Sequence, residues 1–288
     1  MRLRRKVPPP VPRVDLAGRI CVVTGASSGI GLWTARGLAE RGATVCLVGR
    51  DAERTRAHAE ALSAAWEVCD FARLEDVRRL ARTLRSRFEA IHVLVNNAGL
   101  WLPSRRLSAD GIEMTFQVNH LAPFLLTLEL LETLRRSAPA RVVHVSSRLH
   151  EKERALRRDD LEFQERRYGG LRAYRQSKLC NVLFSNELAR RLDRREVTSN
   201  AVHPGDVATN VVRTSVPLQW LSDSIGKLHL LTPEEGARTS LHVASMPELR
   251  DQSGRYFAWC APRAPNPVAL DATLARELWN VSEAMTDR

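Results

Sequence analysis

A tyrosine and a lysine four residues apart, Tyr174 and Lys178, carry the clearest chemical signal in the sequence. On a helix this spacing places both side chains on the same face, about one turn apart. An unperturbed phenol has a pKa of about 10, which is too high for proton transfer at neutral pH. An ammonium about 4 Å away, at an effective dielectric of about 20, lowers that pKa by up to about three units. The pair therefore predicts a general acid or base, the alternative being two side chains on a solvated helix face.

A glycine-rich turn follows the first apolar run, with the sequence Thr24-Gly25-Ala26-Ser27-Ser28-Gly29-Ile30-Gly31. Glycines let the backbone turn tightly and approach a pyrophosphate, and the following helix presents free N–H groups to that charge. The spacing is GxxxGxG rather than the GxGxxG of most dinucleotide-binding folds. The turn predicts a dinucleotide site, and a purely structural strand-to-helix turn is the alternative interpretation.

Apolar runs with little polar alternation are separated by longer amphipathic stretches. We expect strands over 20–23, 43–48, 66–69, 91–95, 141–145 and 197–202, with a seventh at 254–258. We expect one helix that ends near 41 and others over about 52–64, 74–88, 108–136 and 171–192. This order indicates a parallel sheet covered on both faces, and right-handed crossovers make it doubly wound. The prediction is one α/β domain over residues 18–288 with a seven-stranded parallel sheet, preceded by a flexible, basic, proline-rich arm over residues 1–17.

The chain of 288 residues has a formal charge of +11, a balance that can indicate nucleic acid binding. Outside the arm, however, the basic residues are spread among acidic neighbours, and no zinc-finger or RNP-type motif occurs. We therefore expect no nucleic acid partner, and the arm leaves weak peripheral contact with a membrane open. No apolar run approaches the roughly 20 residues of a membrane helix, and no apolar core follows the N-terminal charges as in a signal peptide.

The sequence predicts neither disulfides nor a metal site. Its five cysteines are odd in number and scattered, at Cys21, Cys46, Cys69, Cys180 and Cys260. Three of them lie in Val/Leu-rich runs, where a thiol behaves as a small apolar group. No CxxC, HxH or HExxH spacing is present. We expect free thiols in a reducing, cytoplasmic compartment.

Five motifs in order along this framework resemble the short-chain dehydrogenase/reductase family, from about Gly18 to Ala258. They are the glycine-rich turn, Asn96-Asn97-Ala98-Gly99, Asn119 in Gln117-Val118-Asn119-His120, Ser147 with Tyr174 and Lys178, and Pro204-Gly205 followed by Thr209. The resemblance implies a Rossmann fold in which Tyr174 transfers a proton and Ser147 holds the substrate oxygen. It further implies that Lys178 binds the nicotinamide ribose and that Asn119 anchors a water. Ser146 is the alternative to Ser147, because both follow the fifth strand.

The resemblance also implies which positions bind the cofactor. They are Gly25, Ser27, Ser28, Gly29, Ile30, Gly31, Arg50, Asp70, Asn97, Ala98, Gly99, Tyr174, Lys178, Pro204, Gly205, Val207 and Thr209. NAD-specific relatives usually carry an acidic residue where Gly49 stands. Here Arg50 follows instead, and a guanidinium suits a 2′-phosphate, so we expect NADP(H) rather than NAD(H). We interpret Asp51 as the N-cap of the next helix.

The segment between Ser147 and Tyr174 is long and charged, and in this the chain resembles the retinol dehydrogenase-like branch of the family. The insert, residues 148–168, either is a solvated surface loop or borders the substrate mouth. A lid is expected from Val207 to Lys227, with apolar residues Val211, Val212, Val216, Pro217, Leu218, Trp220 and Leu221. Together with Trp101 and Leu102 it would form a pocket for an apolar carbonyl or alcohol.

The function predicted is hydride transfer between NADP(H) and an apolar carbonyl or alcohol. A homodimer is expected, since the helices after the fourth and fifth strands pair subunits in much of the family. Two other function classes remain open. One is a non-catalytic dinucleotide-sensing or scaffold protein on the same fold, and the other is a membrane or nucleic acid binder that uses the arm.

Overall fold

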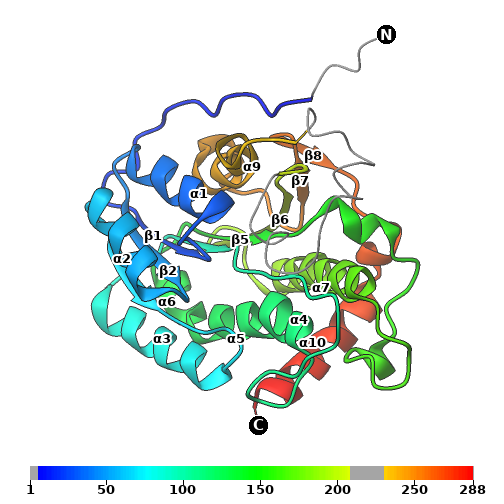
Figure 1. Cartoon of the computed structure of the whole chain (residues 1–288). Helices are drawn as coiled ribbons and strands as arrows, with labels where there is room; N and C mark the ends of the chain where they lie inside the picture. The colour runs from blue at the N-terminus through cyan, green and yellow to red at the C-terminus, as the bar shows by residue number, and fades with distance from the viewer. Residues whose placement is uncertain (1–5, 208–229, 288) are drawn as a thin grey trace.

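Eight strands form one sheet in the computed structural model, which describes residues 6–207 and 230–287 (Figure 1). Their order is β3-β2-β1-β4-β5-β6-β7-β8. The bounds are β1 Ile20–Thr24, β2 Thr44–Gly49, β3 Ala65–Val68, β4 Val93–Asn96, β5 Ala140–Val145, β6 Val197–His203, β7 Tyr256–Ala258 and β8 Ala261–Arg263. Strands β1 to β7 pair in parallel, which confirms the predicted sheet. The prediction of seven strands was one short, because β8 adds antiparallel to β7 across a two-residue turn and is too brief to show a pattern.

Helices cover both faces of the sheet (Figure 1). One face packs on α1 (Gly29–Ala39), α2 (Ala52–Ala61) and α9 (Pro233–Ser245), and their apolar side chains form one core cluster with the strands. The other face packs on α3 (Leu74–Arg87), α5 (Ala122–Glu129), α7 (Gly170–Arg191) and α10 (Ala272–Thr286), which supply the larger cluster. Shorter elements are α6 (Leu131–Arg136), η2 (Arg148–Lys152), η3 (Arg158–Asp160), η6 (Pro247–Leu249) and η7 (Pro267–Leu270).

The helix predicted over 108–136 is not continuous, and it begins later than expected. A turn at Ser108 precedes α4 (Met114–Phe116), whose first N–H groups are capped by the Glu113 carboxylate. The backbone then widens into a π-helix, η1 (Gln117–Leu121), before α5. Pro123 opens α5 and lacks the N–H that a regular α-helix would need at this point. Such π-segments often occur at functional sites, and Asn119 lies in the middle of this one.

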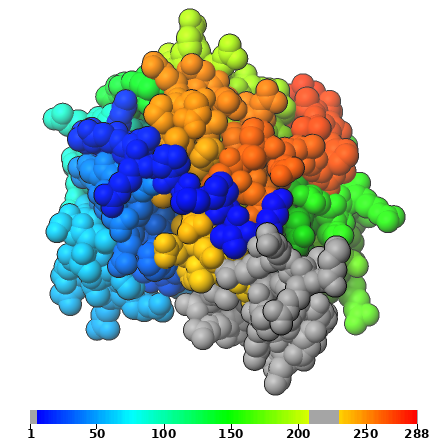
Figure 2. All heavy atoms as spheres, turned by 90° about the horizontal axis from the view of Figure 1, so that it is seen from above, coloured from blue at the N-terminus to red at the C-terminus, as the bar shows by residue number. Residues whose placement is uncertain are grey.

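Residues 6–17 of the predicted arm lie against the domain. The Arg41 guanidinium donates to the carbonyls of Val11 at 2.7 Å and Pro12 at 3.0 Å. Arg238 on α9 donates to the carbonyl of Pro8 at 2.8 Å. Leu16 is buried in the core cluster that contains α1 and α9. The proline-rich segment makes no helix or ladder of its own, so its carbonyls accept hydrogen bonds from arginines of the domain. Figure 2 shows this arm in blue as it crosses the orange surface.

The face of α5 and α7 that was expected to pair subunits is covered by α10. The Trp279 ring of α10 lies 5.0 Å from the Phe124 ring and 5.8 Å from the Phe184 ring. His120 shares a 2.8 Å hydrogen bond with Ser282. A homodimer through this face needs α10 to move, and the homodimer stays a prediction. In the described parts of the chain, no helix has the length and apolar character to cross a membrane.

Candidate active site

The predicted site residues follow the carboxyl ends of the parallel strands. The glycine-rich turn follows β1, Arg50 follows β2, Asp70 follows β3, the Asn96–Gly99 segment ends β4, and Ser146 and Ser147 follow β5. The strand order reverses between β1 and β4, from which the chain winds outward in both directions. Ligands of open α/β sheets bind in the crevice at this reversal.

Thr24 joins the ends of β1 and β4 at that reversal. Its buried hydroxyl accepts from the backbone N–H groups of Asn97 and Ala98, both at 3.0 Å, and donates to the carbonyl of Val95 at 3.3 Å. The Asn97 amide donates back to the carbonyl of Thr24 at 2.8 Å. Sequence reasoning named Asn97 but missed Thr24 as a site residue. The isolated polar residue at the end of an apolar strand was the signal that could have found it.

The turn after β1 comes too close to this junction for side chains. Gly25 has a φ of +65°, and a Cβ there would lie 2.8 Å from the Cα of Ala98. A Cβ at Gly31 would collide with the Asn97 amide and the carbonyl of Gly25. Ser28, the N-cap of α1, makes no capping hydrogen bond with its side chain. The first N–H groups of α1 are therefore presented to an external anion.

Tyr174 and Lys178 lie one turn apart on α7, and Lys178 is buried with 4% of its surface exposed. The Lys178 Nζ lies 5.6 Å from the centre of the Tyr174 ring and donates to the carbonyl of Val145 at 2.9 Å. The Tyr174 hydroxyl shares a hydrogen bond with the Ser147 side chain. The structure thus brings together the predicted trio, and Val145 at the end of β5 is a partner that sequence reasoning missed.

The two serines after β5 have different partners. Ser146 is buried, and its hydroxyl donates to the carbonyl of Lys178 at 2.7 Å, so it ties β5 to α7. Ser147 accepts from the N–H of Leu149 at 3.2 Å, and its side chain also shares a hydrogen bond with the Tyr174 hydroxyl. Only Ser147 of the two therefore contacts the phenol.

Asn119 is held by backbone and side-chain groups within the π-helix. Its Oδ1 accepts from the N–H of Leu100 at 2.7 Å, and its Nδ2 donates to the carbonyl of Leu100 and to Ser177 Oγ, both at 2.9 Å. Ser177 in turn donates to the carbonyl of Tyr174. Asn119 therefore joins the loop after β4 to the catalytic face of α7. The water expected at Asn119 stays a prediction.

The predicted lowering of the Tyr174 pKa was wrong for this structure. Burial raises the pKa of Tyr174 to about 12, although the hydrogen bond with Ser147 lowers it in part. Burial also lowers the pKa of Lys178 to about 8. The ammonium stands over the ring face, and burial is the largest cause of both shifts.

The end of β2 leaves no room for an acidic residue. A Cβ at Gly49 would collide with the Thr55 hydroxyl, which is itself bonded to the carbonyl of Asp51. Arg50 is exposed and forms no ion pair with any described residue. The Asp51 carboxylate accepts from the N–H of Arg54 at 3.0 Å, which confirms it as the N-cap of α2.

The remaining predicted positions surround this crevice or lie outside the described residues. Asp70 accepts from the N–H of Ala72 at 3.1 Å. Gly205 has a φ of +93°, and Val207 forms a β-bridge with Leu231 and packs against Gly236 of α9. Thr209 and the apolar lid residues predicted over 211–221 lie outside the described residues.

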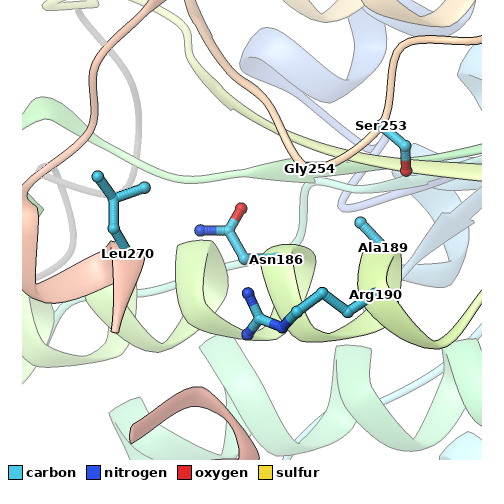
Figure 3. A pocket seen from close by; sticks show the side chains of 6 residues that line it. All are labelled: Asn186, Ala189, Arg190, Ser253, Gly254 and Leu270. Carbon is cyan, nitrogen blue, oxygen red and sulfur yellow. The ribbon is translucent and has the colours of Figure 1, made fainter. Parts of the chain in front are cut away.

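A separate surface hollow of about 240 Å³ lies over the other half of α7 (Figure 3). Its lining is Asn186, Ala189, Arg190, Ser253, Gly254 and Leu270. Asn186 is twelve residues beyond Tyr174, about 18 Å along the helix axis, so the hollow does not belong to the crevice. Within residues 6–207 and 230–287, no group of three or more His, Cys, Asp or Glu side chains is arranged to hold a metal ion.

Comparison with known proteins places this geometry in a family. A family model described as short chain dehydrogenase matches residues 19–158. Human retinol dehydrogenase 11 is 40% identical over 276 residues, covering 93% of this chain and 86% of that protein. The chain belongs to the short-chain dehydrogenase family.

Solved structures of similar proteins agree with this assignment. An uncharacterised protein from Mycobacterium paratuberculosis superposes with a TM-score of 0.77 at 34% identity, covering 95% of both chains. The Pseudomonas aeruginosa protein RhlG, solved as a complex with NADP, superposes with a TM-score of 0.69 at 29% identity, covering 88% of this chain and 98% of that one.

The residues at this edge of the sheet fit the nicotinamide dinucleotide that the family uses. Gly25 and Gly31 let the turn pack directly against Asn97 and Ala98, where a Cβ would collide, and such a tight turn brings the backbone N–H groups close to a pyrophosphate. The uncapped start of α1 presents N–H groups to the same place. Ser147, Tyr174 and Lys178 stand further along the sheet, after β5 and on α7.

We expect Thr24→Val to lower the free energy of unfolding by about 1–3 kcal/mol. Valine keeps the shape but leaves the N–H of Ala98 without its acceptor, at a cost of roughly 1–3 kcal/mol, whereas the N–H of Asn97 keeps its 3.0 Å bond to the carbonyl of Val95. Urea denaturation measures the change, with Thr24→Ser, which keeps the hydroxyl, as the control. Equal stability of the valine and serine variants would contradict the role given to this hydroxyl.

We expect Lys178→Met to stabilise the fold at pH 7. The pKa of Lys178 is depressed from 10.5 to about 8, so below pH 8 folded and unfolded chains are both protonated and the folded state bears the whole desolvation cost. That cost corresponds to about 3 kcal/mol, less about 1 kcal/mol for the lost hydrogen bond to Val145. As pH rises from about 8 to 10.5, only the unfolded chain keeps the proton, and the wild type gains stability.

Urea unfolding at pH 7 and pH 10 checks this expectation. The variant should be more stable by about 2 kcal/mol at pH 7, and the advantage should disappear by pH 10. Lys152→Met, which removes an exposed lysine, should show neither effect. A Lys178→Met protein that is less stable than the wild type at both pH values would contradict this expectation. It would show that interactions of the Lys178 ammonium in the folded state outweigh the cost of its desolvation.

Proposed function

We propose that the protein is an NADP(H)-dependent oxidoreductase that transfers a hydride between the nicotinamide and a carbonyl or alcohol carbon of an apolar small molecule. The observation that carries this proposal is the contact of Ser147 with the Tyr174 hydroxyl beside the buried Lys178. These groups lie at the carboxyl edge of the sheet, where the glycine-rich turn after β1 also lies.

Ser147, Tyr174 and Lys178 then act together with Asn119. Ser147 donates a hydrogen bond to the substrate oxygen and orients it. Tyr174 gives its proton to that oxygen during reduction and takes it back during oxidation. Lys178 binds the nicotinamide ribose and favours the phenolate through its charge. Asn119 holds the loop after β4 and supports the supply of protons.

The bound cofactor supplies the hydride, and the protein supplies position and electrostatics. A phenol whose pKa is about 12 holds its proton firmly at neutral pH, so Tyr174 begins the reduction protonated. The oxygen of a carbonyl that accepts a hydride becomes strongly basic and can take that proton.

The preference for NADP(H) is supported by three observations at the end of β2. The collision at Gly49 excludes an acidic side chain, Arg50 is free to bind a 2′-phosphate, and Asp51 is engaged as a helix cap. The similar protein RhlG is solved as an NADP complex.

The similarity to retinol dehydrogenase 11 supports an apolar substrate. Trp101 and Leu102, just after the Asn96–Gly99 segment, are both partly exposed and available to it. We also propose that the protein works in a reducing, cytoplasmic compartment, since all five cysteines are free. The homodimer and weak membrane contact through the basic arm remain proposals that sedimentation and vesicle binding can test.

Replacing Tyr174 by phenylalanine tests the proposed function directly. Loss of the proton donor should lower kcat by about 10²–10⁴-fold and leave NADPH affinity within about threefold. Turnover is measured with NADPH and NADH against a panel of apolar ketones and aldehydes, including retinal. Tyr256→Phe is the matched control, because the Tyr256 hydroxyl is buried without a partner among the described residues.

The outcomes of this experiment separate the candidate functions. Wild-type turnover that survives in Tyr174→Phe would contradict the proton-transfer role. Tight NADPH binding without turnover on any substrate would favour the dinucleotide-sensing alternative. An absence of both would overturn the enzyme assignment.

Arg50→Ala tests the cofactor preference. A charged hydrogen bond to a phosphate contributes about 1.5–3 kcal/mol, so kcat/KM for NADPH should fall by about 10- to 150-fold while that for NADH stays unchanged. Arg56→Ala, on the exposed side of α2 and paired with Glu60, is the control. A wild type that prefers NADH would contradict the argument from Gly49 and Arg50.

A further inference from the structure

The turn between β7 and β8 has an unusual backbone for its sequence. Only Trp259 and Cys260 separate the paired residues Ala258 and Ala261. Both have positive φ, +59° and +58°, which is the pattern of a type I′ turn. Such turns favour Asn-Gly, and bulky residues in this conformation persist only where surrounding contacts impose it. We therefore expect contacts from neighbouring segments to hold this turn in its strained conformation.

On its inner side the turn packs against the end of β6 and the segment that follows it. The Trp259 ring stands edge-on to the His203 ring, with 6.2 Å between centroids. The same ring lies 3.6 Å from the place where a Cβ of Gly205 would be. His203 and Gly205 flank Pro204, and the resemblance to the family implies that Pro204 and Gly205 bind the cofactor. Trp259 therefore packs directly against the segment from His203 to Gly205.

On its outer side the turn is held by the arm. The Lys6 Nζ lies 5.1 Å from the centre of the Trp259 ring, in a cation–π contact. The Cys260 Sγ lies 4.0 Å from the carbonyl of Pro9, and the N–H of Cys260 donates to Thr239 of α9.

The arm is itself anchored at both ends of its course. Arg238 of α9 binds the carbonyl of Pro8, and Arg41, after α1, binds the carbonyls of Val11 and Pro12. Figure 2 shows the blue arm running across the orange surface toward this region. Residues 6–12, which we term the strap, therefore connect the end of α1 to the strained turn.

We propose that the strap presses the Trp259–Cys260 turn onto His203 and Gly205, and that Trp259 is thereby a positioning residue for cofactor binding. The inference rests on the proposed function, because it assumes that the segment around Pro204 contacts the nicotinamide half of the cofactor. The strap has no contact with Tyr174, Ser147 or Lys178 in the described residues. Its loss should therefore weaken cofactor binding and leave the chemical step intact.

The decisive variant is the double substitution Trp259→Asn with Cys260→Gly. Asn-Gly is the sequence that a type I′ turn prefers, so this variant should fold at least as stably as the wild type. It nevertheless lacks the ring that supports Gly205 and that Lys6 covers. We expect the NADPH dissociation constant and the KM for NADPH to rise about tenfold, with kcat at saturating NADPH within twofold of the wild type.

A second pair of variants tests the strap without touching the turn. Lys6→Ala combined with Arg238→Ala removes two of its contacts and should raise the NADPH dissociation constant about fivefold. Arg13→Ala removes one positive charge from an exposed position of the arm and is the control for a change of charge in the arm, with an expected change below twofold. NADPH fluorescence titration gives the dissociation constants, and thermal unfolding confirms that each variant is folded.

The possible results separate this inference from the proposed function. If the wild type binds neither NADPH nor NADH, the proposed function fails and this inference falls with it. If the wild type binds and turns over but the Trp259→Asn/Cys260→Gly variant binds NADPH equally well, only the positioning role is overturned. A stable variant with weakened NADPH binding and unchanged kcat supports the positioning role. A turn that served only the stability of the fold would not change NADPH affinity in a variant that is as stable as the wild type.

Discussion

The burial of the Lys178 ammonium is the constraint on which the site depends. A charged group in a protein interior requires a partner, and here the carbonyl of Val145 supplies it at the end of β5. Ser146 makes a second bond between the same elements by donating to the carbonyl of Lys178. These two bonds fix α7 against β5, and that registration brings Tyr174 to Ser147. The same loss of water moves both pKa values, that of Tyr174 upward and that of Lys178 downward.

The sheet supplies the frame for this arrangement. Its strands run in parallel from β3 to β7, so the polar residues that end them meet at one edge. Thr24 joins β1 to β4 there, and Asn119 joins the loop after β4 to α7. The glycine-rich turn and the acid–base residues thus belong to one hydrogen-bonded unit. In the further inference, the N-terminal strap, residues 6–12, supports this unit through its contacts with Trp259 and Cys260.

Local patterns in the sequence predicted most of the fold, and most of the residues that they singled out lie together at the carboxyl edge of the sheet. Apolar runs revealed seven parallel strands, and the Tyr174–Lys178 spacing predicted a shared helix face. Three features needed the tertiary structure. The π-helix around Asn119 lies between two local features, the Glu113 carboxylate that caps the start of α4 and Pro123 in the first turn of α5. The docked arm depends on Arg41 and Arg238, which are far away in sequence. The pKa of Tyr174 depends on burial, which a spacing of four residues does not reveal.

The central claim, that Lys178 is buried enough to lose much of its basicity, has a direct test because the chain contains only four lysines, Lys6, Lys152, Lys178 and Lys227. A pH titration followed by NMR on protein labelled at the lysine side chains resolves them, and Lys178→Arg assigns the resonance. The account predicts one lysine that titrates near pH 8 and is missing from the Lys178→Arg spectrum. Four lysines that all titrate near the ordinary value of about 10.4 would contradict it.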